Sequence, residues 1–292
     1  MRPAADVVVP FKGSRAALGA LQNRLAVLAL RPGDTVLVVD NTPDSEPVAD
    51  EHVIAAPQIP TPAFARNRGA ERGRAEWLVF IDADTVPSPD LLDRYFDPPP
   101  EPATGLVAGG VVEPEPPRDA AAVVRYSYLR QTASQDDTFA FGEWGYPKSA
   151  NIAVRREAFE AIGGFREEIR AAEDADLTYR LRAAGWKVER REEAAVVHAS
   201  RQTVRGFVVQ KLVWGAGGAW VNRTYPGAVP LLGRRSFARW ALSAFGGGVV
   251  NALRKRSRDA FIFAVFRPLE AVAWELGRLL PNERPVRSWR RR

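Results

Sequence analysis

The sequence predicts an α/β fold: a mostly parallel sheet flanked by helices and followed by a helical tail. Two observations lead to this fold. Short apolar runs, each about as long as one buried strand, alternate with segments whose leucines recur at helical spacing. Turns rich in Gly, Pro, Asn and Asp separate them. This alternation is typical of parallel strands joined by helical crossovers, and we expect a main domain over residues 1–225 and the tail over 226–292.

The first part of the chain carries the clearest periodicity. Leu18, Leu21, Leu25 and Leu28 follow the three-to-four-residue spacing of one helix face. The elements expected here are, in order, a strand at 7–9, a helix over 14–29, strands at 35–39 and 53–54, a helix over 62–74 and a strand over 76–81. This order of strands and helices is that of a parallel sheet.

The second part is less regular. The elements expected here are a strand around 105–108, a helix over 118–131, an irregular segment over 132–147, a short helix ending near 163, a helix over 171–185, strands at 186–188 and 194–198, and tail helices over 230–292. In the tail, Phe261, Val265, Leu269, Val272 and Leu276 lie at helical spacing, and Arg267 and Pro268 interrupt the apolar run that these residues belong to. The irregular segment is rich in Gly and aromatic residues, and we interpret it either as a wall of a substrate site or as a mobile surface loop.

Acidic side chains follow predicted strands at the point where each strand ends. Asp40 closes the second strand, and Asp82 and Asp84 come directly after the fourth. Ligands of parallel sheets bind beyond these strand ends, where Pro10 also lies. Residues i and i+2 of a strand point to one side, so Asp82 and Asp84 bring two negative charges together. A divalent cation that carries a phosphate is the occupant favoured by this arrangement; the alternative is an acidic turn capped by Thr85.

Composition narrows the chemistry and the compartment. The chain has no cysteine and two histidines, which excludes disulfides and thiolate metal sites and disfavours a multi-histidine zinc centre. A reducing compartment fits, and the N-terminus lacks the apolar segment of a secretory signal, so we expect a cytoplasmic location. The net charge of +6 is uneven: residues 226–292 carry 14 Lys and Arg against 4 Asp and Glu, or +10, which leaves −4 for residues 1–225.

The basic tail favours an anionic partner. Lipid headgroups are one interpretation of that partner, and a solvated helix face is the alternative reading of the charge. No stretch reaches the roughly 20 apolar residues that span a bilayer, so we expect the tail to lie on the inner face of the membrane as a peripheral element. The other interpretations are a homodimer interface and packing on the main domain. No nucleic-acid-binding motif accompanies the charge, and no nucleic-acid partner is expected.

Seven short segments follow one another in an informative order. They are residues 7–10 (VVVP), 38–41 (VVDN), 65–70 (ARNRGA), 80–84 (FIDAD), 150–156 (ANIAVRR), 163–165 (GGF) and 173–177 (EDADL). With these segments the sequence resembles the family 2 glycosyltransferases, which have the GT-A fold, a Rossmann-like sheet flanked by helices. The resemblance covers residues 5 to about 200. It implies a metal-assisted, inverting transfer of a sugar from a nucleotide-diphospho-sugar donor, with Mg²⁺ or Mn²⁺ as the cofactor.

The resemblance implies roles on the donor side of a site in residues 1–225. Asp40 matches a residue that contacts the nucleotide base, and Arg66 matches an arginine near the nucleotide. Asp84 matches the main metal ligand, while Asp82 matches a residue that contacts ribose or metal-bound water. Pro10, at the end of the first strand, is expected to line the nucleotide-sugar site.

On the acceptor side, Asp174 matches the general base that takes the proton of the attacking hydroxyl. Glu173 is expected beside it in the nucleotide-sugar site; the alternative is that both carboxylates stabilise the start of a helix. Asn151 is expected to contact the sugar or the acceptor, or else to be a turn residue. His198 is expected to complete the metal or diphosphate site, or else to be a hydrogen-bonded residue at the edge of the sheet.

The same residues are compatible with more than one function. Val213 stands where processive relatives carry the Arg of a Gln-X-X-Arg-Trp motif, which favours transfer of a single sugar. We expect an enzyme of cell-envelope or polysaccharide glycan synthesis whose acceptor is a glycan or a lipid-linked molecule. One alternative is a non-catalytic homologue that binds a membrane or a partner. The other is a sugar nucleotidylyltransferase, which would need a Gly-rich loop after the first strand, where residues 10–14 hold one Gly.

Overall fold

The computed structural model describes residues 2–229 and 234–283. The chain divides into two compact units. Unit 1 comprises Met1–Val111, Thr138–His198 and Glu283–Arg292. Unit 2 comprises Val112–Asp137 and Ala199–Asn282. The sequence-predicted boundary between residues 225 and 226 therefore lies within unit 2.

Unit 1 holds an eight-stranded sheet with the order β3-β2-β1-β4-β7-β6-β8-β5. Its strands are β1 (Ala5–Phe11), β2 (Thr35–Asp40), β3 (Val53–Ala55), β4 (Trp77–Ile81), β5 (Thr85–Pro87), β6 (Thr104–Val112), β7 (Asn151–Arg155) and β8 (Lys187–His198). Its helices are α1 (Arg15–Leu25), α2 (Pro62–Arg72), α3 (Leu91–Phe96), the short 3₁₀ turn η1 (Gly142–Trp144), α6 (Arg156–Ala161) and α7 (Glu173–Ala183). The short helix α5 (Asp136–Phe139) spans the positions at which the assignment changes from unit 2 to unit 1.

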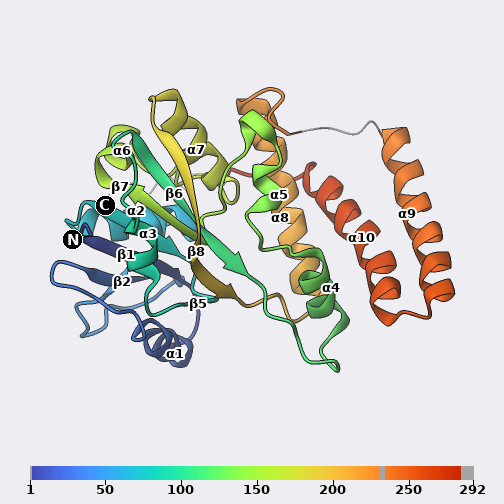
Figure 1. The fold of residues 1–292 in the computed structure, drawn as a ribbon, viewed down its shortest axis with the longest axis horizontal. Helices are drawn as coiled ribbons and strands as arrows, with labels where there is room; N and C mark the ends of the chain where they lie inside the picture. The colour runs from blue at the N-terminus through green and yellow to red at the C-terminus, as the bar shows by residue number, and fades with distance from the viewer. Residues whose placement is uncertain (1, 230–233, 284–292) are drawn as a thin grey trace. The chain divides into compact units, whose positions relative to one another are not determined.

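The parallel half of the sheet confirms the prediction from periodicity. Strand β1 pairs in parallel with β2 on one side and β4 on the other, and β2 pairs in parallel with β3. The apolar run of β4 is buried over its whole length because helices cover both faces of a parallel sheet. Figure 1 shows α1 on the opposite side of these strands from α6 and α7.

The other half of the sheet is antiparallel, with β7 between β4 and β6 and with β5 paired to β8. Here the sequence prediction of two short strands at 186–188 and 194–198 is wrong, because β8 runs unbroken over Lys187–His198. The charged stretch 189–193 between the two apolar segments has several exposed side chains. A strand with one wet face does not need a continuous apolar run.

The core of unit 1 joins α2, α6 and α7 to one face of the sheet. Phe80 of β4 lies at its centre, with ring centroids 5.5 Å from Phe159 and 5.2 Å from Phe165. Helix α2 approaches β1 closely at Gly69, where a Cβ atom would come within 2.3 Å of the Val8 side chain. A glycine is therefore needed there to bring α2, which carries Arg66, onto the sheet.

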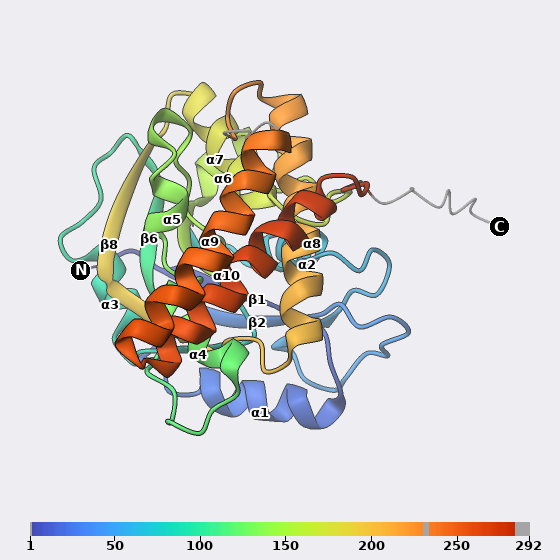
Figure 2. The ribbon, with the colours of Figure 1, turned by 90° about the vertical axis from the view of Figure 1, so that its right-hand side faces the viewer.

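Unit 2 is helical. It holds α4 (Ala122–Arg130), α8 (Val204–Thr224), α9 (Arg234–Lys255) and α10 (Arg258–Gly277). Tyr126 of α4, Phe207 of α8 and Phe266 of α10 form a buried aromatic cluster. Figures 1 and 2 both show α9 and α10 lying side by side as a helical hairpin. Within the described residues, none of the helices combines the length and the hydropathy that a bilayer crossing requires.

The helical spacing expected from Phe261 to Leu276 is confirmed, since α10 continues unbroken through Pro268. A proline inside a helix removes one backbone hydrogen bond and crowds the preceding turn. Pro268 is buried, so its ring contributes apolar contact within unit 2 and the helix is retained.

Candidate active site

The turn after β4 carries Asp82 and Asp84, and its backbone is held on both sides. The Thr85 amide and hydroxyl both donate to the Asp82 carbonyl, at 3.1 and 2.7 Å. Arg24 of α1 donates to the Ala83 carbonyl at 2.7 Å. Because the backbone bonds fix the turn, the two carboxylates stand at a defined place at the end of the strand, and about a third of each side chain (32%) remains accessible to solvent.

Strand pairing brings His198 to this turn. Thr85 of β5 lies opposite His198 of β8 in the antiparallel register. The Nε2 atom of His198 is 3.5 Å from Oδ1 of Asp84, and its Nδ1 atom is buried with no hydrogen-bond partner among the described residues. The family resemblance suggested that these two residues belong to one metal or diphosphate site, and the structure brings them together.

The donor atoms at this pair suit a shared cation. Two ligand atoms that each lie about 2.1 Å from one ion are roughly 3–3.5 Å apart, which agrees with the separation of Asp84 and His198. Carboxylate oxygen and imidazole nitrogen are both ligands of first-row divalent ions. Among the described residues, no three His, Cys, Asp or Glu side chains form a metal cage, so phosphate or water oxygens would supply the remaining ligands.

Arg66 joins the acidic turn to helix α7. Its Nη2 atom donates to Asp82 at 2.7 Å and its Nη1 atom to Glu173 at 2.8 Å, while its guanidinium lies 5.5 Å from the centre of the Phe165 ring. The arginine is buried. Burial alone would lower its pKa, but the two carboxylates outweigh burial and the pKa of Arg66 is raised. The arginine therefore stays charged and holds together two acids that lie 91 residues apart in the sequence.

Asp174 follows Glu173 in the first turn of α7. Its carboxylate accepts the backbone amides of Ala175 at 2.8 Å and Ser149 at 3.4 Å. Desolvation by the surrounding protein, and next the negative charge of Glu173, raise the pKa of Asp174 to about 7. A carboxylate with this pKa exchanges a proton near neutral pH, as a general base must.

Helix α7 begins from a strained residue. Ala172, which precedes Glu173, has φ +67°, in the left-handed region that residues with a Cβ seldom adopt. Such a conformation costs on the order of 1 kcal/mol or more and clusters at functional sites. The strained residue directly precedes Glu173, which is paired with Arg66. The sequence does not predict this strain, because glycine is the residue expected in a left-handed conformation.

Asp40 and Pro10 lie at the same edge of the sheet. Pro10 pairs with Val39, and Phe11, the last residue of β1, pairs with Asp40, the last residue of β2. Since β1 lies between β2 and β4, Asp40 and the acidic turn after β4 flank the end of β1. Asp40 is buried and accepts the Thr42 amide at 3.0 Å.

Asn151 has a different environment from the other predicted residues. It is buried as the first residue of β7; its Oδ1 accepts the Tyr95 hydroxyl at 2.7 Å, and its Nδ2 donates to the Gly110 and Ala194 carbonyls at 2.9 and 2.7 Å. These bonds tie β6, β7, β8 and α3 together. The structure does not bring the Asn151 side chain to the carboxylates, so its predicted contact with a sugar or acceptor stays a prediction beside an evident packing role.

An aromatic segment that the sequence prediction treated only in general terms adjoins Asp174. Tyr146 belongs to this segment, and desolvation and then the negative charge of Asp174 raise the pKa of its hydroxyl. Tyr179 of α7 donates to the Trp144 carbonyl at 2.8 Å and packs edge-on against both the Trp144 and Tyr146 rings. Arg182, one turn further along α7, donates to the Gly145 carbonyl at 2.5 Å. Within unit 1, this segment is anchored to α7, as a wall of a site would be.

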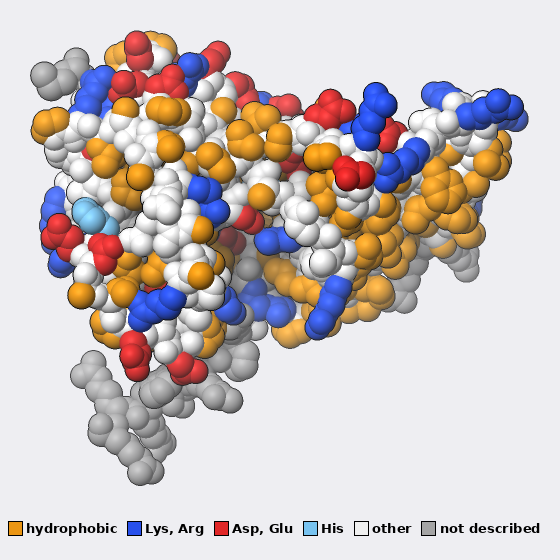
Figure 3. Space-filling view, turned by 90° about the horizontal axis from the view of Figure 1, so that it is seen from below, with side chains coloured by type: hydrophobic (Ala, Val, Ile, Leu, Met, Phe, Trp, Pro, Cys, Tyr) orange, Lys and Arg blue, Asp and Glu red, His pale blue; other side chains and the backbone are white. Residues whose placement is uncertain are grey.

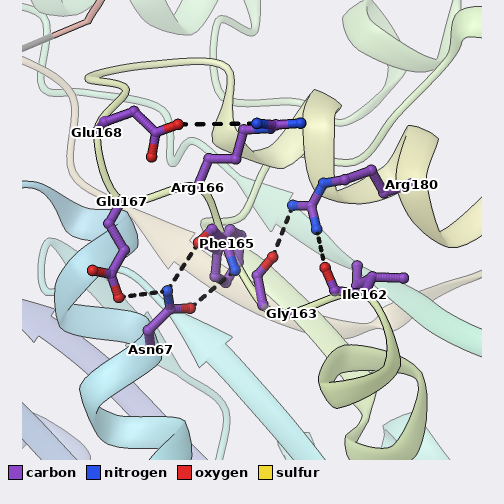
Figure 4. A pocket seen from close by; sticks show the side chains of 9 residues that line it. Asn67, Ile162, Gly163, Phe165, Arg166, Glu167, Glu168 and Arg180 are labelled. Atoms are coloured by element: carbon purple, nitrogen blue, oxygen red, sulfur yellow. Dashed lines mark hydrogen bonds and ion pairs between the residues drawn. The ribbon is translucent and has the colours of Figure 1, made fainter.

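A pocket of about 420 Å³ lies near the site but has another lining (Figure 4). It is formed by Asn67 of α2, the loop over residues 162–168 and Arg180 of α7. Figure 4 shows Asn67 bonded to Phe165 and Glu167, and Arg180 bonded to loop carbonyls. These bonds fix the loop that places Phe165 against Arg66. We therefore interpret the residues around this pocket as structural support for the candidate site.

The comparison with known families decides the classification. The sequence profile described as "Glycosyltransferase like family 2" matches residues 3–217, which is most of the chain. The chain belongs to this glycosyltransferase family. The membership confirms the resemblance on which the site prediction rests, and the matched range takes in every residue of the site described above.

Curated relatives within the family are distant. The chain is 28% identical over 261 residues to the pre-mycofactocin glycosyltransferase of Mycobacterium tuberculosis, with 83% of this chain and 53% of that protein covered. It is 27% identical to the succinoglycan biosynthesis protein ExoA of Rhizobium meliloti, with 70% and 68% covered. The chain thus spans about half the length of the first of these relatives.

Solved structures support the fold. A mannosyltransferase of Pyrobaculum calidifontis, PcManGT, solved in complex with GDP-Man and Mn²⁺, covers 94% of this chain and is itself covered to 88%, with a TM-score of 0.64 and 17% identity. At that identity the likeness is one of fold, and it confirms the predicted GT-A architecture with C-terminal helices.

Proposed function

We propose that this glycosyltransferase-family protein catalyses the inverting transfer of one sugar from a nucleotide-diphospho-sugar to an acceptor hydroxyl. The observation that carries the proposal is the connection of the site: Asp82 and Glu173 share Arg66, with Asp84 and His198 on one side and Asp174 on the other. Such a site can hold a diphosphate through a cation at one end and deprotonate a nucleophile at the other.

Asp84 and His198 are the residues that would hold Mn²⁺ or Mg²⁺, with Asp82 next to them. When bound, the divalent ion stabilises the negative charge that develops on the departing nucleoside diphosphate. The Mn²⁺ and nucleotide sugar bound in the mannosyltransferase structure support this choice of ligand class. Asp40, which ends the neighbouring strand β2, is proposed to accept a hydrogen bond from the nucleotide base, and its place at the strand end supports this role.

Asp174 is proposed to take the proton of the acceptor hydroxyl as that oxygen attacks the anomeric carbon. Direct displacement inverts the configuration, and it requires a base on the face of the sugar away from the leaving group. A pKa of about 7 leaves a large fraction of Asp174 ionised at neutral pH while keeping it basic enough to accept the proton. Glu173, paired with Arg66, positions the start of α7 and so the base itself.

The acceptor is proposed to be a glycan or a lipid-linked molecule of the cell envelope. The name of the succinoglycan relative and that of an O-antigen rhamnosyltransferase of Salmonella anatum, to which 26% of the chain aligns, support a role in surface glycan synthesis. Val213, in place of the arginine of processive enzymes, supports single-sugar transfer. We further propose a cytoplasmic protein that works at the inner membrane surface.

The proposal is tested by thermal melting of the full chain with Mn²⁺ and a panel of uridine, guanosine and thymidine diphospho-sugars. One of them should raise the melting temperature by mass action, and only when metal is present. Release of the matching nucleoside diphosphate should then follow, and Asp84→Asn should abolish both signals. Asp119→Asn, at an exposed carboxylate, is the matched control and should leave them intact.

Other results would point elsewhere. Donor binding without turnover for any hydroxyl acceptor would favour a non-catalytic homologue. Formation of a nucleotide-sugar from a nucleoside triphosphate and a sugar phosphate would favour a nucleotidylyltransferase. Either result overturns the proposed transfer.

A further inference from the structure

The hairpin of α9 and α10 is closed on its inner side by small residues. Gly248 packs so tightly on α10 that a Cβ atom there would come within 2.8 Å of the Ala264 Cβ. Ala252 of α9 and Ala264 of α10 are buried. The Ser257 hydroxyl caps α10 by accepting the Ala260 amide at 3.2 Å. These contacts define the inner faces of the hairpin and leave the large apolar side chains elsewhere on the two helices.

The outer side of the hairpin is apolar. Leu242, Phe245 and Leu253 of α9 recur at helical spacing and are exposed, Leu242 to 75% and Leu253 to 69%. Phe261 and Leu276 continue the apolar surface on α10. Figure 3 shows hydrophobic side chains gathered over α9 and α10, with Lys and Arg at their borders.

This concentration is unusual within the described chain. Eighteen large hydrophobic side chains are exposed among the described residues, and ten of them lie between residues 242 and 280. In unit 1 the exposed ones are scattered valines and leucines, such as Val27 and Leu30. Scattered apolar residues need no explanation, whereas a contiguous apolar surface marks an interaction site.

The end of the same hairpin is strongly basic. Arg254, Lys255, Arg256 and Arg258 occupy four of five consecutive positions at the turn, and all are exposed. The acid next in the chain, Asp259, is paired with Arg125 at 2.7 Å, so it does not neutralise the turn. An apolar helix face that ends in a basic cluster is the pattern of elements that lie in the interface of an anionic bilayer.

Other occupants fit the surface less well. A nucleic acid would meet the basic turn but gain nothing from the apolar side chains. A second copy of the hairpin would bring two clusters of four positive charges into one assembly, which opposes close association. An anionic lipid surface complements both the charge and the apolar character.

We propose that the α9–α10 hairpin is the lipid-docking surface of this protein, with Leu242, Phe245, Leu253, Phe261 and Leu276 in the acyl–headgroup boundary and the basic turn against anionic headgroups. This inference rests on the membrane-surface location proposed above and gives it a structural basis. It does not depend on the sugar transfer, because none of these residues belongs to the carboxylate site.

The apolar contribution is tested by flotation of the full chain with vesicles of phosphatidylcholine containing 30% phosphatidylglycerol. The wild type should float with these vesicles and much less with pure phosphatidylcholine. The triple variant Leu242→Gln/Leu253→Gln/Leu276→Gln should lower the lipid partition coefficient at least about 10-fold. The control Val27→Gln/Leu30→Gln, which also removes exposed apolar side chains, should float like the wild type.

The charge contribution is tested at the turn. Arg254→Gln/Lys255→Gln should weaken binding about 10-fold or more at low salt and less at 0.5 M salt, because screening shortens the reach of the charges. Arg15→Gln/Arg72→Gln removes the same charge from exposed positions in unit 1 and should have little effect.

Three results would overturn the inference: a wild type that does not float with anionic vesicles, variants that float as well as their controls, or a solution dimer that the triple variant dissolves. Circular dichroism and melting temperature of each variant must match the wild type, and a variant that fails this check is replaced by its Ser counterpart. Donor-dependent nucleoside diphosphate release, measured without lipid, should be unchanged in the hairpin variants. Loss of docking and loss of catalysis are thereby told apart.

Discussion

The two acidic pairs of the site have opposite surroundings, although one arginine joins them. Asp82 and Asp84 lie in a turn where about a third of each side chain is accessible and where the His198 imidazole is 3.5 Å from Asp84. Glu173 and Asp174 start a helix in a desolvated environment that raises the pKa of Asp174 to about 7. Solvent-accessible carboxylates beside an imidazole are favourable ligands for a cation, whereas a desolvated carboxylate binds a proton more readily. The difference supports the proposed division of the reaction, with the cation at the first pair and the proton at the second.

The variant with the largest expected effect on this difference between the two acidic pairs is Asp174→Asn. Loss of a general base costs roughly 10²–10⁴-fold in rate, so we expect about a 10³-fold lower turnover with donor binding retained. Single-turnover rates and donor melting shifts measure the two quantities separately. A variant that loses both in equal measure would place Asp174 in the donor site and contradict its role as the base. Asp119→Asn is the control, as an exposed carboxylate.

The complementary variant is Asp84→Asn. Here we expect the Mn²⁺-dependent donor binding to disappear together with about 10²–10³-fold of the rate, because the charge on the leaving group loses its electrostatic stabilisation. Isothermal titration with Mn²⁺ and the donor checks the first effect. Undiminished metal-dependent binding in this variant would show that the cation is held elsewhere.

The link between the pairs is broken by Arg66→Met. Removal of one partner from a buried ion pair costs about 3–5 kcal/mol; because Asp82 retains solvent contact, we expect about 3 kcal/mol of lost stability. Urea unfolding measures it. The variant Arg66→Lys keeps the charge but not the two-pronged geometry, and it should recover part of the stability while leaving turnover low. Full recovery of turnover by lysine would mean that the geometry of the link is unimportant.

The sequence predicted the parts of the site that follow from local pattern. Strand periodicity and strand ends located Asp40, Asp82 and Asp84. It did not predict what depends on distant pairing: the bridge of Arg66 to Glu173 crosses 107 residues. The proximity of Asp84 and His198 depends on the pairing of β5 with β8, and only the family resemblance suggested it.

Other features were not predicted because their residues differ from those usually found in such a conformation or element. The left-handed Ala172 stands where glycine is expected. The middle of β8 is charged, so the sequence did not predict it as strand, because apolar runs are the signal for buried strands. The extent of unit 2 was missed because its first helix, α4, is separated in sequence from the tail and joins it through tertiary packing around Tyr126.

The pH dependence of stability sharpens the contrast between the pairs. The pKa of Asp174 is about 7 in the folded state and 3.8 as a free side chain, so the folded state binds more protons between these values. Stability therefore falls as pH rises from about 4 to about 7, and it stays lowered above 7. Asp174→Asn removes the buried charge and should stabilise the protein by up to about 4 kcal/mol at pH 8, the free-energy equivalent of the difference between the two pKa values, and by less than about 1 kcal/mol at pH 4. Urea unfolding at the two pH values measures this, and an equal effect at both would mean that the Asp174 carboxyl is not desolvated.

The smallest expected effect tests the imidazole of the hydrated pair. His198→Ala should weaken Mn²⁺ binding about 10-fold, since one ligand or orienting group is lost and Asp84 remains. The chain supplies a matched control, because its other histidine, His52, is 61% exposed beside Glu51, and His52→Ala should bind Mn²⁺ like the wild type. Electron paramagnetic resonance of free Mn²⁺ measures both affinities. If the two variants bind equally, His198 is a residue of the sheet edge that only lies near Asp84, and the cation depends on carboxylates alone.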